Sequence, residues 1–437
     1  MSESVNISQD EKKPLQGWRW VIEKNAGGDK VIWGLVVLLT IASLLVVYSA
    51  TGSLAYKNYQ GNTEFYLFKQ VFFIVIGFAF IYFLHKVNYN VYSKIATILF
   101  WFSIPLLIYT FLFGVKINEG SRWIRLPIIN MTMQSSDLAK LALFMFLARL
   151  LSKKQAVIKD FRKGFLPLIL PVAGMCLVIA PANLSTALLL GASCLMLLFI
   201  GRVNVKYLFG VIAIAAIPLV MLIVAAVARH GSESDVQAQV AVEQVQQENP
   251  AKEKNKLLAR VDTWINRVGN FIYSEKEGNE DEMYQNNQAK IAIASGGILG
   301  AGPGNSVMRD YLPQAYNDFI YAIIIEEYGL MGGAFILFIY IVFLYRCIRI
   351  FKRCPFAFGA FLALGLSFTL VIQAMANMAV TVNLFPVTGV TLPLVSMGGS
   401  SFLFTCAAIG IILSVSRSVE EMRKEKTMET VSQIENE

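Results

Sequence analysis

Long apolar runs alternate with polar segments along almost the whole chain. A helix needs about 17–25 mostly apolar residues to cross a bilayer, and somewhat fewer where polar residues flank a buried span. Ten runs fit this requirement: Val31–Tyr48, Phe68–Leu84, Ile95–Phe113, Leu138–Leu151, Phe165–Ile179, Leu184–Ile200, Tyr207–Val227, Phe319–Tyr345, Phe356–Val380 and Phe402–Val415. The fourth, fifth and tenth are short, and Pro181 with Asn183 predicts a tight re-entrant pair at the fifth and sixth. The pattern predicts an all-α polytopic membrane protein of about ten transmembrane helices.

Lysine and arginine predict the orientation of these helices, because cytoplasmic loops are enriched in both residues. The basic segments lie before the first run, after the fourth, sixth and eighth runs, and after the last: 12–30, 153–163, 202–206, 346–353 and 417–424. Both termini are therefore expected in the cytoplasm, and the loops 49–67, 114–137, 229–317 and 381–401 outside. The chain divides into a cytoplasmic tail (1–30), seven spans (31–228), a large extracytoplasmic loop (229–317), three spans (318–415) and a second cytoplasmic tail (416–437).

The large outer loop contains a helical pattern and a glycine-rich segment. Apolar residues recur at three- to four-residue spacing over residues 257–272, which predicts an amphipathic helix lying in the outer membrane interface. The alternative is a helix packed on other outer loops. The sequence SGGILGAGPGNS (295–306) follows, and its glycines predict a flexible backbone that approaches another segment closely.

Composition narrows the function. The 437 residues are 56% hydrophobic and 16% charged, whereas soluble proteins carry about 25% charged residues. The net charge of +8 is spread between apolar runs, which disfavours nucleic-acid binding. Only two histidines and five cysteines occur, with no CxxC motif, so the chain offers few residues for histidine-based catalysis or zinc binding.

Three carboxylates stand at or inside the eighth apolar run. A carboxylate in a membrane span is costly unless it is paired, hydrated or functional. Asp318 precedes the run, where it can act as a base, bind a cation or cap the helix. Glu326 and Glu327 lie deeper, and we expect them to pair with a lysine or arginine on another span.

Two outer segments carry cations. The first, NEGSRWIRLP (118–127), presents Arg122, Trp123 and Arg125, which suit phosphate contact or an ordinary aromatic-belt anchor. The second, QSSDLAK (134–140), opens the fourth run. Asp137 can cap that helix, and Lys140 is either its structural partner or a cation aimed at an anionic substrate.

The segment FPVTGVTLPLVSMGGSS (385–401) is rich in proline, glycine and hydroxyl residues. Irregular backbone at membrane depth is tolerated only where it is buried in protein or lines a wet cavity. We therefore expect a polar cavity that opens outward at this segment.

Five blocks, in order, carry a family resemblance: NEGSRWI, QSSDLAK, PANLSTA, the SGGILGAGPGNS segment followed by YLPQAYNDFIYAIIIEE, and TGVTLPLVSMGGSS. They resemble the SEDS family (shape, elongation, division and sporulation) of bacterial membrane proteins, which polymerise peptidoglycan glycan strands. The resemblance covers nearly the whole chain. It leans towards the division member of the family, with the elongation member as the alternative.

The resemblance implies roles for particular residues. Asp318 matches the position of the family's catalytic aspartate, and Trp123, Lys140 and Glu326 match positions important for activity. Ser400 and Ser401, at the end of the last block, are expected to contribute to substrate binding together with Arg122, Arg125 and Lys140, while Asp137 and Glu327 support the site. The chain departs from the family pattern at four positions: Ser135, Asp137, Asn183 and Tyr316, the last in place of a histidine.

The resemblance further implies a peptidoglycan glycosyltransferase that polymerises lipid II into β-1,4 glycan at the outer face of the bacterial cytoplasmic (inner) membrane, during septal synthesis. It implies a class B penicillin-binding protein (a transpeptidase) and other divisome membrane proteins as partners. A divalent cation, Mg²⁺ or Mn²⁺, with Asp318 as its ligand is a further expectation. The rival classes are a lipid flippase or ion-coupled transporter, for which Glu326, Glu327 and Lys140 would matter most, and a catalytically idle divisome scaffold.

Overall fold

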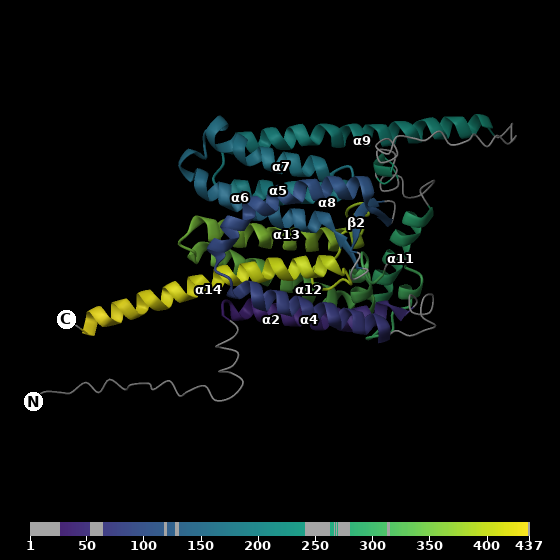
Figure 1. Ribbon diagram of the computed structural model, residues 1–437. Coiled ribbons are helices and arrows are strands. Elements are labelled where there is room, and N and C mark those ends of the chain that lie inside the picture. Colours follow the sequence, from purple (N-terminus) through teal and green to yellow (C-terminus); the bar gives the residue numbers. More distant parts are fainter. Residues whose placement is uncertain are drawn as a thin grey trace, which may run out of the picture.

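The structure is a computed structural model that describes residues 27–52, 64–117, 120–126, 131–240, 263–265, 267, 269, 280–312 and 315–435. Within these residues a helix occupies each of the ten predicted spans. They are α2 (Lys30–Ala50), α4 (Glu64–Lys86), α5 (Tyr89–Phe113), α6 (Ser135–Lys154), α7 (Leu166–Ile179), α8 (Leu184–Ile200), α9 (Val205–Val240), α12 (Ile320–Arg353), α13 (Ala357–Thr381) and α14 (Ser400–Glu435). Figure 1 shows these helices side by side in one bundle.

Eight of the described helical segments are long and apolar enough to cross a membrane by length and composition. The 17-residue α8 is a shorter apolar helix, and α6, which carries Asp137, Lys140 and Arg149, is not among the eight. The turn between α7 and α8 is as tight as predicted, and Asn183 caps α8 by accepting from Thr186 N at 3.2 Å. Residues Phe161–Ile179 suffice for a complete crossing, which favours two spans over a re-entrant pair.

The bundle has two distinct ends (Figure 1). The end where α2 begins and α14 leaves the bundle is called the terminal end. The opposite end carries the strands and α11 (Glu280–Gly296), and is called the sheet end. The predicted basic segments connect helices at the terminal end. There Asp29 caps α2 through Val31 N at 2.9 Å and pairs with Arg346 of α12 at 2.5 Å, which fixes the start of the bundle.

A small antiparallel sheet departs from the all-α prediction. Strands β1 (Val115–Ile117), β2 (Gly120–Leu126) and β3 (Met131–Gln134) lie in the order β1-β2-β3, with Trp123 opposite Gln134. The strands are three to seven residues long, too short to give a clear alternating pattern. Because β3 runs directly into α6, the sheet fixes where α6 begins.

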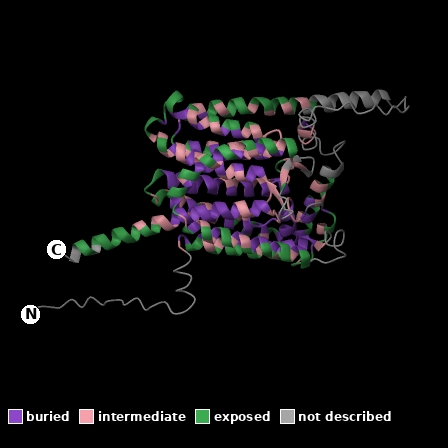
Figure 2. Ribbon diagram, viewed as in Figure 1, coloured by how far each residue is buried: buried purple, intermediate pink, exposed green. Residues whose placement is uncertain are grey.

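The centre of the bundle is α13. Of its most apolar 18-residue window 83% is buried, against 6% for α9 at the periphery. Figure 2 shows the same contrast between a buried centre and an exposed outer helix. Helix α13 packs against α6, α8, α12 and α14, so its polar side chains reach several elements. The side chains of α13 at the sheet end therefore face protein and not lipid.

Helix α12 is broken at Gly329, whose φ of 68° is left-handed. The glycine-rich segment docks into the break: Ala301 N donates to Glu326 O and Gly302 N to Glu327 O, both at 2.9 Å. A Cβ at Gly300 would lie 2.3 Å from Glu327 O. The predicted close approach is confirmed, and the segment is held by hydrogen bonds instead of being free.

Two helices extend past the predicted spans, and one prediction stands largely outside the described residues. Helix α9 continues to Val240, past the predicted start of the outer loop at 229, and α14 continues to Glu435. The apolar part of α9, Val205–Ala225, ends before residue 229, and the predicted domain boundaries stay predictions. Most of the predicted interfacial helix 257–272 lies outside the described residues. Of its described residues, Ile265 is buried by the protein.

Gly300→Ala should destabilise the protein more than Gly304→Ala. Both glycines have positive φ, 85° and 78°, which costs a non-glycine residue about 1–3 kcal/mol. Only at Gly300 would the Cβ also collide with backbone, since Gly304 faces open space. Thermal unfolding in detergent measures the difference. Equal destabilisation by the two substitutions would contradict the docking of this segment on α12.

Candidate functional site

Asp318 lies in an irregular segment just before α12, at the sheet end, and is half-buried. Helix α12 begins at Ile320, with Phe319 at the N-cap position and no side-chain cap. The helix-cap interpretation of Asp318 is therefore wrong. Because Asp318 stands outside the helix, its carboxylate does not follow the helical spacing to Glu326.

The backbone around Asp318 is held by hydrogen bonds to its three consecutive carbonyls. Tyr316 O accepts from Met397 N at 3.1 Å, Asn317 O from the Ser396 hydroxyl at 2.7 Å, and Asp318 O from Asn377 Nδ2 at 2.8 Å. The donors belong to α13 and to the irregular segment that follows it. The segment that carries Asp318 is thus fixed to the centre of the bundle.

Tyr316 is the close neighbour of Asp318. Burial raises the pKa of the Tyr316 phenol, and the Tyr66 hydroxyl and the Asp318 carboxylate raise it further. Tyr316 stays neutral at physiological pH, so its hydroxyl can donate a hydrogen bond. At the position where the resembling family has histidine, this chain therefore places a group that cannot carry positive charge.

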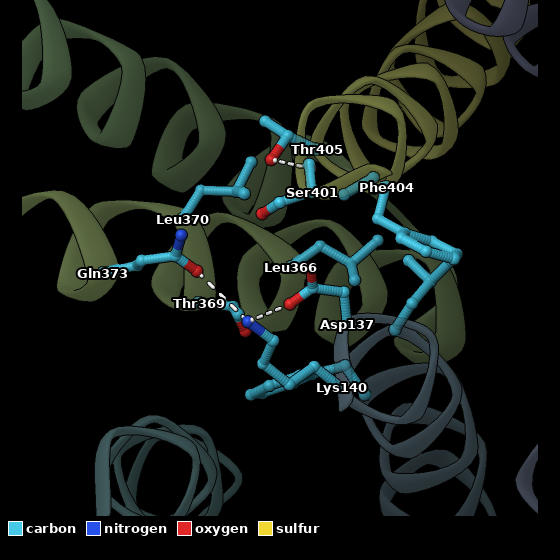
Figure 3. A pocket seen from close by; sticks show the side chains of 12 residues that line it. Asp137, Lys140, Leu366, Thr369, Leu370, Gln373, Ser401, Phe404 and Thr405 are labelled. Atoms are coloured by element: carbon cyan, nitrogen blue, oxygen red, sulfur yellow. Dashed lines mark hydrogen bonds and ion pairs between the residues drawn. The ribbon is translucent and has the colours of Figure 1, made fainter. Parts of the chain in front are cut away.

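Asp137 and Lys140 form an ion pair at the start of α6, with Lys140 Nζ 2.7 Å from Asp137 Oδ1. Gln134 occupies the N-cap position, so the prediction that Asp137 caps the helix was wrong. Lys140 also donates to Gln373 Oε1 of α13 at 3.3 Å. Figure 3 shows the ammonium group between the carboxylate and the amide.

Two cavities meet at Lys140. The larger lies between α6, α13 and α14 and is lined by Asp137, Ser401, Thr405 and apolar side chains (Figure 3). The second lies towards α8 and is lined by Thr186, Ser193 and Val390. Lys140, Thr369 and Gln373 line both. Lys140 is therefore both the structural partner of Asp137 and a cation presented to a cavity, so the two interpretations do not exclude each other.

The segment 385–401 is irregular and largely buried, as predicted, and it lines the site. Leu394 has a φ of 63° and Ser396 is buried. The Ser401 hydroxyl faces the larger cavity, 3.4 Å from the Thr391 hydroxyl. Ser400 instead accepts from Gln134 N at 3.2 Å, which joins α14 to the sheet. Of the two serines, Ser401 is placed to contact a ligand.

The described side chains of the first outer segment do not line these cavities. Trp123 is half-buried in β2 and Arg125 is exposed, and neither lines the two cavities. The side chain of Arg122 lies outside the described residues. Their predicted contact with a substrate stays a prediction.

Glu326 and Glu327 are buried. The prediction that they pair with a lysine or arginine on another span was wrong, because among the described residues they have other partners. Glu326 accepts from the Ser306 hydroxyl, from Val307 N at 2.9 Å and from Met308 N at 3.2 Å. Glu327 accepts from the Ser49 hydroxyl of α2. These glutamates anchor the loop before Asp318 and the end of α2, which is a structural role.

Sequence reasoning missed two amides of α13. Gln373 and Asn377 stand four residues apart in an otherwise apolar helix, so both lie on one face. Gln373 Nε2 donates to Thr391 O at 2.9 Å, and Asn377 Nδ2 to Val390 O at 2.7 Å. Amides at this spacing inside a span were the signal that could have found them.

Comparisons with known proteins agree with this fold. Residues 29–421 match the family model FtsW/RodA/SpoVE, described as cell cycle protein, and the chain belongs to this family. It is 31% identical over 395 residues to the probable peptidoglycan glycosyltransferase FtsW of Geobacter sp. (strain M18), covering 89% of this chain and 97% of that protein. It is 30% identical over 402 residues to stage V sporulation protein E of Bacillus subtilis (strain 168), covering 90% and 98%.

Solved structures show the same fold. A chain from the structure titled "Structural coordination of polymerization and crosslinking by a peptidoglycan synthase complex" superposes with a TM-score of 0.64 at 21% identity, over 90% of this chain and 98% of that chain. The crystal structure of the rod shape determining protein RodA of Thermus thermophilus gives 0.56 at 22% identity, over 89% and 97%. The polytopic helical architecture is therefore shared.

Lys140→Met should lower the free energy of unfolding by about 3 kcal/mol, because it leaves the Asp137 carboxylate buried without its partner. The double variant Asp137→Asn/Lys140→Met removes both charges and should recover part of that loss. Thermal unfolding in detergent of the double variant and of both single variants, Asp137→Asn and Lys140→Met, measures both effects. A double variant as unstable as the sum of the single substitutions would contradict a coupled pair.

Proposed function

We propose that this protein is a peptidoglycan glycosyltransferase that polymerises lipid II at the outer face of the bacterial cytoplasmic membrane. One observation carries the proposal: at the sheet end, α13 joins the segment that bears Asp318 to the Lys140 ion pair and its cavities. Asp318 itself lines neither cavity, but Asn377 and Gln373, four residues apart on α13, contact its main chain and Lys140. A carboxylate and a cation connected in this way, beside apolar walls, suit an anionic lipid-linked sugar. Names of relatives in the same family support the assignment.

The orientation supports chemistry outside the cell. The described basic segments lie at the terminal end, which supports a cytoplasmic position for that end and an outer position for the sheet end. Asp318, Lys140 and the cavities then lie near the outer surface of the membrane. Lipid II reaches such a site along the outer leaflet without leaving the membrane.

The reaction is a single inverting displacement. The 4-hydroxyl of the acceptor sugar attacks the anomeric carbon of a sugar linked to a lipid diphosphate. A β-1,4 bond forms to carbon 1, the bond from carbon 1 to the α-linked diphosphate breaks, and the diphosphate leaves with its electron pair. Asp318 takes the proton of the attacking hydroxyl, as a general base. Tyr316, neutral beside it, can donate a hydrogen bond within the same site.

The leaving diphosphate needs positive charge, and Lys140 supplies it. Its ammonium group lines both cavities while Asp137 and Gln373 hold it in place. A fixed cation stabilises charge that develops on a leaving group. Arg122 and Arg125, on β2, are candidates for the more exposed phosphate.

A divalent cation fits this site as a bridge between protein and substrate. Among the described residues no group of three or more histidine, cysteine, aspartate or glutamate side chains could hold a metal ion. Mg²⁺ is commonly bound through one or two carboxylates together with substrate phosphates. Asp318 would be the protein ligand, and the ion would neutralise charge on the diphosphate.

Septal synthesis with a class B penicillin-binding protein is part of the proposal. Several relatives carry the name of the division member FtsW, and one similar chain belongs to a peptidoglycan synthase complex. Ion-coupled transport has less support, because Glu326 already accepts hydrogen bonds from the Ser306 hydroxyl and from two backbone donors.

Asp318→Asn should abolish glycan polymerisation while the protein stays folded and bound to its transpeptidase, because the amide cannot accept the proton of the attacking hydroxyl. The assay supplies lipid II and Mg²⁺ or Mn²⁺ to proteoliposomes that contain the cognate transpeptidase, and strand length is read on gels.

Asp310→Asn is the matched control, since it removes an exposed carboxylate from the same loop. It should leave strand synthesis unchanged. Long strands from Asp318→Asn would refute the base role. No strands from folded, partner-bound wild type would refute the proposed function itself.

A further inference from the structure

We infer that Asn377 of α13 is the positioning residue for Asp318, and that Gln373 one turn away sets the position of Lys140. The inference rests on the proposed function and adds to it the part of the fold that holds base and cation at a fixed separation. Neither amide was singled out by the sequence patterns above.

Asn377 is placed to fix the Asp318 main chain. Its side chain is buried, and its Nδ2 donates to Asp318 O at 2.8 Å and to Val390 O at 2.7 Å. One amide nitrogen has two hydrogens, so both are used. A carbonyl or carboxylate oxygen in the same place would face two carbonyl oxygens and repel them. The position therefore requires a donor with two hydrogens.

The segment that carries Asp318 needs such a donor. It precedes α12 and is not helical, so no ladder of helical hydrogen bonds holds it. Asn377 is the third of three successive donors, after Met397 N and the Ser396 hydroxyl, and the one nearest the carboxylate along the chain. Losing it removes this hydrogen bond from the residue whose side chain reacts, while the bonds to Tyr316 and Asn317 remain.

Gln373 makes the equivalent connection to the cation, Lys140. It lies four residues before Asn377 on the same face of α13, and its Nε2 donates to Thr391 O at 2.9 Å, next to Val390. Its Oε1 accepts from Lys140 Nζ at 3.3 Å. The two amides thus donate to the consecutive carbonyls of residues 390 and 391. Together they connect the segment of the base to the cation.

The two amides should act on different kinetic constants. Asn377 touches the segment of the base, so its loss should misplace the base in the transition state. Gln373 touches the cation that binds the diphosphate, so its loss should weaken substrate binding. A displacement of about 1 Å in a reacting group can cost about a hundredfold in rate.

The experiment measures kcat and KM for lipid II polymerisation by the full chain with its cognate transpeptidase in proteoliposomes. Asn377→Leu keeps the branched shape of the side chain and removes the donors, and should lower kcat on the order of tenfold to a hundredfold with KM nearly unchanged. Gln373→Leu should chiefly raise KM. Thr381→Val, a buried change one turn further along α13, removes only a bond to Asn377 O and should alter neither constant.

The outcomes separate this inference from the proposed function. Wild type that makes no strands, although folded and partner-bound, refutes the proposed function. Wild type that makes strands, with Asn377→Leu equal to it in kcat, refutes only the positioning role. Equal losses in Asn377→Leu and Thr381→Val would also refute it, because they would report general damage to α13.

Ser396→Ala provides a second test if Asn377→Leu fails to assemble. It removes the hydroxyl that donates to Asn317 O, and should lower kcat less than Asn377→Leu while leaving KM unchanged. A Ser396→Ala variant with wild-type kcat would contradict positioning through this segment.

Discussion

Backbone polar groups inside a membrane protein have to find their hydrogen bonds within the protein, and the sheet end of this bundle depends on that constraint. The irregular segment between α13 and α14 cannot satisfy its carbonyls by helix formation. Side chains from neighbouring helices do so instead: Asn377 and Gln373 of α13 for residues 390 and 391, Tyr340 of α12 for Pro393, and Ser43 of α2 for Val395. Each of these donors is buried or half-buried, so each bond forms where water competes little.

The same hydrogen bonds create the candidate site. A segment that is fixed by side chains can hold a carboxylate outside a helix. Its direction is then not set by the regular geometry of a helix. Asp318 is held in this way, and the 390–397 segment that helps to hold it contributes Val390 to the smaller cavity beside Lys140. The broken helix α12 follows the same rule, since the glycine-rich segment supplies the partners that Gly329 leaves open. Preorganised groups of this kind are what stabilisation of a transition state requires.

The sequence predicted the ten helical runs well because hydrophobic length is a strong signal for a membrane span. It also predicted an irregular, cavity-lining segment at 385–401 and a close approach by the glycines. It could not predict the partners of Glu326 and Glu327, since a buried carboxylate can be satisfied by hydroxyl and backbone donors as well as by a cation. The cap roles given to Asp137 and Asp318 failed because each helix begins where tertiary contacts place it, at Ser135 and Ile320. Gln373 and Asn377 escaped notice because their partners are distant in sequence.

The central claim is that a lipid-linked sugar diphosphate binds at the sheet end, between Asp318 and Lys140. The most direct measurement is photo-crosslinking of the full chain with lipid II that carries a photoreactive group on its sugar, followed by mapping of the labelled peptides. The account predicts labelling in residues 315–319, in 390–401 and near the start of α6, competed by unmodified lipid II. Specific labelling confined to the terminal end, near Asp29 and Arg346, would contradict it.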